Sequence, residues 1–339
     1  MRIKRIMMFL AATISLLFFT LSAQGVGRPF ITRWFGVKGE PISLPIVGKN
    51  YKLVIKKVCG TKIKEVVISV TDPAKAYKFI PQETGEYRVE AGPEGVEYIA
   101  MSGNPSSAER LLYVEKFGTV QWTTMSGAFS VCKHMQFAYN IDVPDLSNVK
   151  DMSNMFVACH SFTADLSKWD VSGVTNMASL FSGCSSFNSD LSRWNVGNVT
   201  NMSMMFSACY AFNSNLSRWN VGNVTDMSKM FTFCFAFNSD LSRWDVRNVE
   251  DMRSMFLGCN NFNSDLSRWE VRNVENMSSM FFECRNLDSD FSRWDVSNVK
   301  NMSLMFAYCK KLLSDFRKWN IQSDIYKEGM FLGCPFYED

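Results

Sequence analysis

One residue spacing dominates this chain. Cysteines recur every 25 residues, as Cys159, Cys184, Cys209, Cys234, Cys259, Cys284, Cys309 and Cys334. Tryptophans keep the same step, as Trp169, Trp194, Trp219, Trp244, Trp269, Trp294 and Trp319. A fixed period between about 20 and 50 residues is typical of stacked supersecondary units. The period therefore predicts a solenoid, in which each coil buries its flanks only against its neighbours.

The spacing inside one repeat predicts its local structure. Asn188-Ser189-Asp190 is turn chemistry, because short Asx side chains bond their own backbone two residues on. Trp194 and Val196 are two residues apart, which places them on one face of a strand. Steps of three, three and four residues from Val199 to Phe206 predict one face of a short helix. We therefore expect an α/β solenoid of 25-residue coils, each with a short strand and a short helix.

The array has distinct ends. Met125 and Phe129 repeat the pattern of Met152 and Phe156, but at 27 residues instead of 25. In the last repeat Lys327 replaces the methionine of the earlier ones. We predict about eight coils over residues 118–339, closed by a polar C-terminal cap.

Two other regions precede the array. Residues 1–23 have a basic start, an apolar run and a small-residue exit at Ser22-Ala23, which predicts a cleaved signal peptide and an exported protein. The apolar run is shorter than the ~20 residues that a membrane span needs. Residues 28–117 contain short strand-like stretches separated by glycine and proline, which predicts a small all-β sandwich.

Composition excludes several function classes. Without residues 1–23 the chain has 33 basic and 33 acidic residues, whereas nucleic-acid binders normally have a marked basic excess. Only His134 and His160 are present, which disfavours zinc enzymes and imidazole-based catalysis. We expect no catalytic residues, no cofactor and no metal site.

The cysteine and tryptophan columns are expected to be structural. Export would permit disulfides. However, equivalent cysteines near the ends of neighbouring helices would lie roughly 8–10 Å apart, too far for a bridge. We predict buried free thiols, with Cys59 and Cys132 unassigned. Exposed tryptophans would form a sugar-binding platform, but their position beside Val196 and its equivalents favours the core.

A column of basic residues is the candidate binding site. One cation precedes each column tryptophan and should therefore point outward. These residues, the basic stripe, are Lys168, Arg193, Arg218, Arg243, Arg268, Arg293 and Lys318, and Arg247 and Arg272 extend the best patch. The alternative is structural pairing with nearby acids, such as the turn column that begins at Asp165 and Asp190. Exposed ion pairs contribute only ~0–1 kcal/mol each, so stability alone hardly requires seven cations in one row.

The repeat also resembles a known family. The pattern F-N-x-D-L-S-x-W-x-V-x-N-V-x-x-M-x-x-M-F-x-x-C looks like the repeat of BspA-like bacterial surface proteins, and the likeness covers about residues 118–339. The L-x-x-W-x-V segment is similar to the strand of leucine-rich repeats. The resemblance implies a leucine-rich-repeat-like solenoid on an exported protein that adheres to matrix proteins or cells. It supplies no catalytic residues.

Together these features predict a secreted or surface-exposed, non-enzymatic binding protein. Its partner would be a matrix protein, a cell-surface protein or a glycan, recognised by the extended repeat surface. The alternative is a structural spacer or surface-layer component, with binding left to the N-terminal β-domain.

Overall fold

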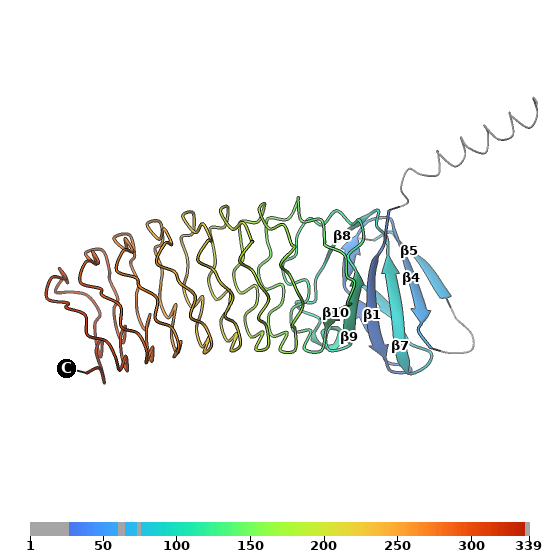
Figure 1. The fold of residues 1–339 in the computed structure, drawn as a ribbon. Coiled ribbons are helices and arrows are strands. Elements are labelled where there is room, and N and C mark those ends of the chain that lie inside the picture. The colour runs from blue at the N-terminus through green and yellow to red at the C-terminus, as the bar shows by residue number, and fades with distance from the viewer. Residues whose placement is uncertain (1–26, 60–64, 73–75, 336–339) are drawn as a thin grey trace, which may run out of the picture.

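The computed structural model describes residues 27–59, 65–72 and 76–335 (Figure 1). The predicted signal peptide lies outside these residues. Among the described residues, no helix is both long and apolar enough to cross a membrane.

The N-terminal region is built on a six-stranded sheet. Its strands lie in the order β10-β9-β1-β7-β4-β5. They are β1 (Phe30–Gly36), β4 (Tyr51–Lys57), β5 (Glu65–Val70), β7 (Gly85–Ala91), β9 (Leu111–Lys116) and β10 (Gln136–Phe137). Two small sheets pair β2 (Ile42–Leu44) with β6 (Tyr77–Phe79) and β3 (Ile46–Gly48) with β8 (Val96–Ile99), and one short helix, α2 (Pro105–Ala108), precedes β9.

The sheet region and the repeats share one core. Strand β10 lies beyond the boundary expected at residue 117, and it pairs in parallel with β9. The sheet region therefore runs to residue 137, and the first coil supplies its edge strand. The ring of Phe117 contacts Phe137 and Trp169 at centroid distances of 5.3 and 5.6 Å. The N-terminal region thus covers the first coil of the array (Figure 1).

The repeats stack as a row of coils (Figure 1). Parallel bridges join equivalent positions of successive coils, from Asp151–Asn176 to Asn301–Tyr326. Within one repeat, the amides of Met202, Phe206 and Ala208 donate to carbonyls 24 residues later, at 2.7–3.0 Å. In the first coil the offset is 26 residues, as from Phe129 to Met155, because two extra residues must be accommodated.

The expected short strand and short helix are absent. Residues 138–335 contain no assigned helix or strand. Each coil is instead a series of tight turns, closed by bonds from Trp194 N–H to the Leu191 carbonyl, Val199 to Val196 and Cys209 to Phe206. Side chains three residues apart face the core because each turn returns the chain inward. The predicted inward residues were therefore correct, while the predicted strand and helix were wrong.

Left-handed backbone at two positions per coil makes this path possible. In one repeat they are Met204 and Ala208, with φ of 55° and 57°. Non-glycine residues adopt this conformation only at a free-energy cost. The same two positions recur through the array, although most of them are not glycine. The coil-to-coil hydrogen bonds offset this cost in every repeat.

The predicted inward columns are confirmed. Column tryptophans are only 3–7% exposed, and column phenylalanines such as Phe206 and Phe231 are fully buried. The rings of those two phenylalanines stack at a centroid distance of 5.6 Å with planes 7° apart. Similar stacks join the rest of the column. The repeats therefore form one continuous apolar core.

Buried polar side chains bond the neighbouring coil. The indole N–H of Trp219 donates to the Leu191 carbonyl at 3.0 Å. The Ser264 hydroxyl accepts the Leu241 amide at 2.8 Å. Equivalent bonds recur along both columns. These residues recur because each satisfies a buried polar group of the previous coil.

The thiols are free, as predicted, but for a different reason. Cys59, Cys132 and the column cysteines from Cys159 to Cys309 form no disulfide, and of these only Cys59 is exposed. The argument from helix spacing fails, since the repeats have no helices and neighbouring coils stack closely. Each column thiol instead donates to a phenylalanine carbonyl of the previous coil, as from Cys209 to Phe181 at 3.0 Å. Burial also raises the pKa of Cys159, to about 12, which suppresses the reactive thiolate.

We expect one fast-reacting thiol in the native protein and ten after unfolding, all without reductant. Cys59 reacts first because it is exposed, whereas the column thiols are buried. Titration with a chromogenic disulfide reagent, with and without denaturant, measures both numbers. A count of two or fewer in denaturant contradicts the free-thiol core.

Replacing Ser264 by Ala should destabilise the protein by about 1–3 kcal/mol, because the buried Leu241 amide loses its acceptor. Denaturant unfolding measures the change in free energy. The matched control is Ser182→Ala, at a partly buried serine whose hydroxyl has no hydrogen-bond partner among the described residues. Equal effects of the two substitutions would contradict the proposed bond.

Candidate binding surface

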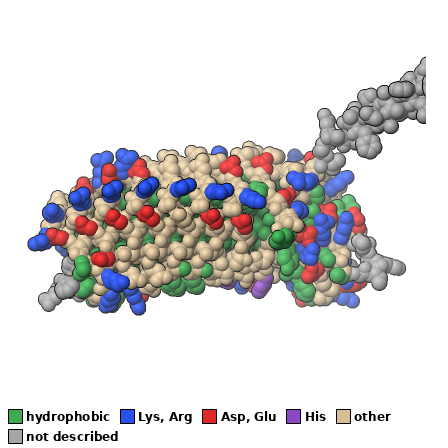
Figure 2. Space-filling model, in the orientation of Figure 1, with side chains coloured by type: hydrophobic (Ala, Val, Ile, Leu, Met, Phe, Trp, Pro, Cys, Tyr) green, Lys and Arg blue, Asp and Glu red, His purple; other side chains and the backbone are tan. Residues whose placement is uncertain are grey.

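The basic stripe lies on the outer side of the first turn of each coil. Arg193, for example, sits between the buried residues Leu191 and Trp194, whose backbone bond closes the turn at 3.0 Å. The inward positions on both sides force the arginine outward. All seven stripe residues are exposed. Figure 2 shows basic side chains in a row along the array, with acidic side chains beside them.

Within the part of the chain that the structure describes, the stripe cations form no ion pair with a carboxylate. The ion pairs within residues 138–335 are Arg247–Asp245, Arg253–Asp251, Arg285–Glu283, Lys300–Glu275 and Arg317–Asp315. None of them includes a stripe residue. The alternative considered from the sequence was that the stripe cations pair with nearby acids. In this part of the chain no stripe nitrogen lies within 4.0 Å of a carboxylate oxygen, so these pairs are not formed.

The turn acids are engaged by serine instead. Asp190 accepts the backbone N–H of Ser192 at 2.9 Å, and Asp265 accepts that of Ser267 at the same distance. Backbone and side-chain bonds from these serines lower the pKa of both aspartates, more than the nearby arginines do. The acids therefore fix the turn that presents the stripe, and the cations remain available.

The two flanking arginines differ from each other. Arg247 binds Asp245 through two nitrogens, at 2.8 and 2.7 Å. This contact raises the pKa of Arg247 and lowers that of Asp245. Arg272 is exposed and makes no ion pair in the described part of the array. The predicted patch around Arg243 and Arg268 thus keeps three unpaired guanidinium groups.

A groove of about 610 Å³ lies further along the same coils, and no residue pattern in the repeat predicted it. It is lined by Asn223, Thr225, Asn248, Glu250, Asn273, Glu275, Asn298 and Lys300. The asparagine amides are already used, since Asn248 donates to the Gly222 carbonyl at 2.6 Å and its equivalents do the same. The asparagines therefore hold the coils together, and the groove is a by-product of that column.

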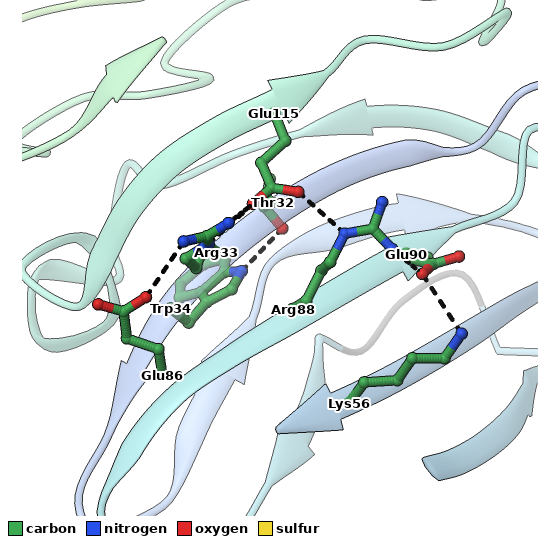
Figure 3. Close-up of polar contacts among 8 residues, drawn as sticks. All are labelled: Thr32, Arg33, Trp34, Lys56, Glu86, Arg88, Glu90 and Glu115. Carbon is green, nitrogen blue, oxygen red and sulfur yellow. Dashed lines mark hydrogen bonds and ion pairs between the residues drawn. The ribbon is translucent and has the colours of Figure 1, made fainter. Parts of the chain in front are cut away.

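Charged side chains on the β-sheet form a second cluster (Figure 3). Glu115 of β9 binds Arg33 of β1 at 2.7 Å and Arg88 of β7 at 2.9 Å. Burial acts to raise the pKa of Glu115, but the two arginines outweigh it and lower the pKa overall. The ladder continues to Glu86 on one side and to Glu90 and Lys56 on the other. Because these charges are paired, the cluster ties strands together and leaves little charge for a ligand.

The described residues contain no group of three or more His, Cys, Asp or Glu side chains placed to hold a metal ion. His160 bonds the Gly183 carbonyl through Nδ1 at 2.8 Å, so it links two coils.

The class defined by this geometry is a β-sheet region joined to a regular array of 25-residue repeats. The family described as "Mycoplasma protein of unknown function, DUF285" matches residues 123–244 and 226–339, which together exceed half of the chain. The chain belongs to this family. Comparisons with curated proteins and with solved structures found no match.

Acid should weaken the array through the turn aspartates. Their pKa values are lower in the folded state, so their contribution to stability is present above the ordinary aspartate pKa of 3.8 and is lost as pH falls through the lower folded values. Asn215 occupies the same column and accepts the Ser217 amide at 3.0 Å without a charge. The triple variant Asp190→Asn/Asp240→Asn/Asp265→Asn should therefore lose less stability between pH 5 and pH 3 than the wild type. Thermal unfolding across that range measures this, and identical pH profiles would contradict the assignment.

Proposed function

We propose that this chain is an exported, non-enzymatic binding protein whose repeat array recognises an extended anionic partner along the basic stripe. In this proposal the array is a leucine-rich-repeat-like solenoid of the BspA-like kind, and the N-terminal region is a small β-sandwich that covers its first coil. The partner is a matrix protein, a cell-surface protein or an acidic glycan. The predicted signal peptide supports export.

The single observation that carries the proposal is the unpaired state of seven exposed cations in one row. Core phenylalanines of successive coils stack at about 5.6 Å, so the stripe residues are repeated at a similar interval. Like charges held this close repel one another, and an anionic ligand relieves that repulsion. The contacts are individually weak and act together because the array holds them in register.

The acidic neighbours restrict the shape of the partner. An aspartate such as Asp165 or Asp190 lies three residues before each stripe cation except Arg218, which follows Asn215. Four of the cations also have an acid two residues after them, at Asp170, Asp245, Glu270 and Asp295. A broad anionic surface would meet these acids on both sides of the stripe. A narrow chain that carries its charges in a line avoids them. The charge pattern therefore favours an extended polymer over a flat protein face.

The charge-reversing variant Arg243→Glu/Arg268→Glu should lose binding by about tenfold or more, because it replaces attraction by repulsion at the centre of the stripe. Heparin, an acidic linear glycan, and matrix proteins immobilised on a sensor surface serve as probes. Wild-type affinity should also fall as salt rises, because exposed charges are screened.

The matched control is Arg253→Glu/Arg285→Glu. It makes the same change in net charge at exposed arginines that already pair with Asp251 and Glu283. Binding should survive in this control. Equal losses of binding in both variants would show that net charge alone, and not the stripe, determines affinity. Full binding by Arg243→Glu/Arg268→Glu would show that the stripe does not bind the partner.

A second candidate places binding in the N-terminal region, with the array as a spacer. Strand β5 forms the sheet edge opposite β10, and its Val66 and Val67 are 39% and 59% exposed. An exposed apolar edge strand can accept a strand from another chain. Partner binding that survives in the stripe variant and is lost after Val67→Lys would favour this candidate.

A further inference from the structure

The array carries a cluster of exposed aromatic side chains away from the basic stripe. We define the aromatic patch as Tyr210, Phe233 and Phe235, which are 47%, 44% and 42% exposed. The rings of Tyr210 and Phe235 stack at a centroid distance of 5.1 Å with planes 18° apart. Phe233 lies 6.1 Å from Phe235. In the coils before the patch, the positions equivalent to Phe233 and Phe235 carry small or polar side chains, such as Gly183 and Ser185.

Backbone strain fixes one of these rings. Phe233 has φ of 58°, at a position that is glycine in three other repeats, Gly183, Gly258 and Gly333. A bulky residue in this conformation is an outlier that costs free energy. The ring lies over the backbone of Gly258, where an added Cβ would approach it within 2.6 Å. The same left-handed φ occurs at Ala158 and Ala208 in other coils, so neither the backbone nor the core requires a phenylalanine here. The exposed ring is therefore a feature of the surface of this coil.

The face around the patch is uncharged. Residues 182–188, 207–213, 232–238 and 257–263 contain no Asp, Glu, Lys, Arg or His. Charge returns in the next coil, at Glu283 and Arg285. This uncharged face therefore suits a neutral ligand, whereas the basic stripe suits an anionic one.

Polar groups flank the stacked rings on both sides. Tyr210 and Phe235 cover one face of each other, and Ser185 and Asn260 occupy the equivalent position in the coils before and after them. The Oδ1 atom of Asn260 is buried and has no hydrogen-bond partner among the described residues. A buried unsatisfied oxygen is rare and costs free energy. Because this oxygen has no accessible surface, it can accept a ligand hydroxyl only when the Asn260 side chain turns outward, and the new bond would then offset that cost.

We propose that the aromatic patch is a binding site for a neutral oligosaccharide. The sugar ring would stack its C–H face on Tyr210 or Phe235, and its hydroxyls would bond the side chains of Ser185 and Asn260. An aromatic ring beside hydroxyl and amide groups suits a ligand that is apolar on one face and polar at its edge. This proposal does not depend on the basic stripe, because the two surfaces use different columns of the repeat.

The test is binding of the full chain to a printed set of neutral and acidic oligosaccharides. The wild type should bind a subset of the neutral ones, and Tyr210→Ala/Phe235→Ala should reduce that binding by about tenfold or more. Tyr210→Phe keeps the ring and should retain binding. The matched control is Tyr326→Ala, which removes a 74% exposed tyrosine elsewhere on the array. Thermal unfolding of the double variant should remain cooperative, which shows that loss of binding is not loss of the fold.

The stripe variant Arg243→Glu/Arg268→Glu should bind neutral oligosaccharides normally, so failure of this site and failure of the stripe are distinguishable. Absence of any neutral oligosaccharide binding by the wild type overturns the proposal, as does unchanged binding by the double variant. Retention on phenyl-agarose that the double variant loses, without oligosaccharide binding, would instead indicate an apolar protein partner.

Discussion

Hydrogen bonding between successive coils is the interaction on which the array depends. Turns alone satisfy only part of the backbone of each coil, and the remaining amides reach carbonyls of the next coil, as from Met202 to Asp226. Indole, thiol and hydroxyl groups in the core extend the same system, since each bonds a carbonyl or an amide of an adjacent coil. The residue type at these positions is therefore determined by the hydrogen bond that the adjacent coil requires. This explains why tryptophan, cysteine and serine recur at one spacing, where apolar residues of similar size would also fill the space.

Periodicity was sufficient to predict the inward columns and the stacked architecture. It could not predict the backbone between them. Spacings of two, three and four residues are shared by strands, helices and consecutive turns, so Trp194, Val196 and Val199 fitted the wrong elements. The left-handed positions gave only a partial signal, because they are glycine in some coils, as at Gly183 and Gly258, but not at Met204 and Ala208. Only coil-to-coil bonding makes them acceptable, and that interaction is not visible in one repeat.

The basic stripe, too, was only partly predictable from the sequence. Its exposure followed from its place beside an inward tryptophan, but its pairing did not. An aspartate three residues away is as near in sequence as many ion-pair partners, yet Asp190 turns to the backbone of Ser192. That local bond is fixed by the turn, whereas an ion pair to Arg193 would have to order a long side chain in water. The aromatic patch consists of residues that differ from the repeat consensus. The repeat pattern therefore could not predict it.

Equivalent interfaces between coils also bear on how such a gene can change. Phe206 meets Phe231 much as Phe231 meets Phe256, with centroid distances of 5.6 Å in both cases. Removal or duplication of one whole unit in the middle of the row therefore joins two surfaces that already fit. Unequal recombination between the near-identical coding segments would lengthen or shorten the molecule in single steps without a new folding problem. The length of the array can thus change by whole repeats while the residues exposed on each coil stay the same.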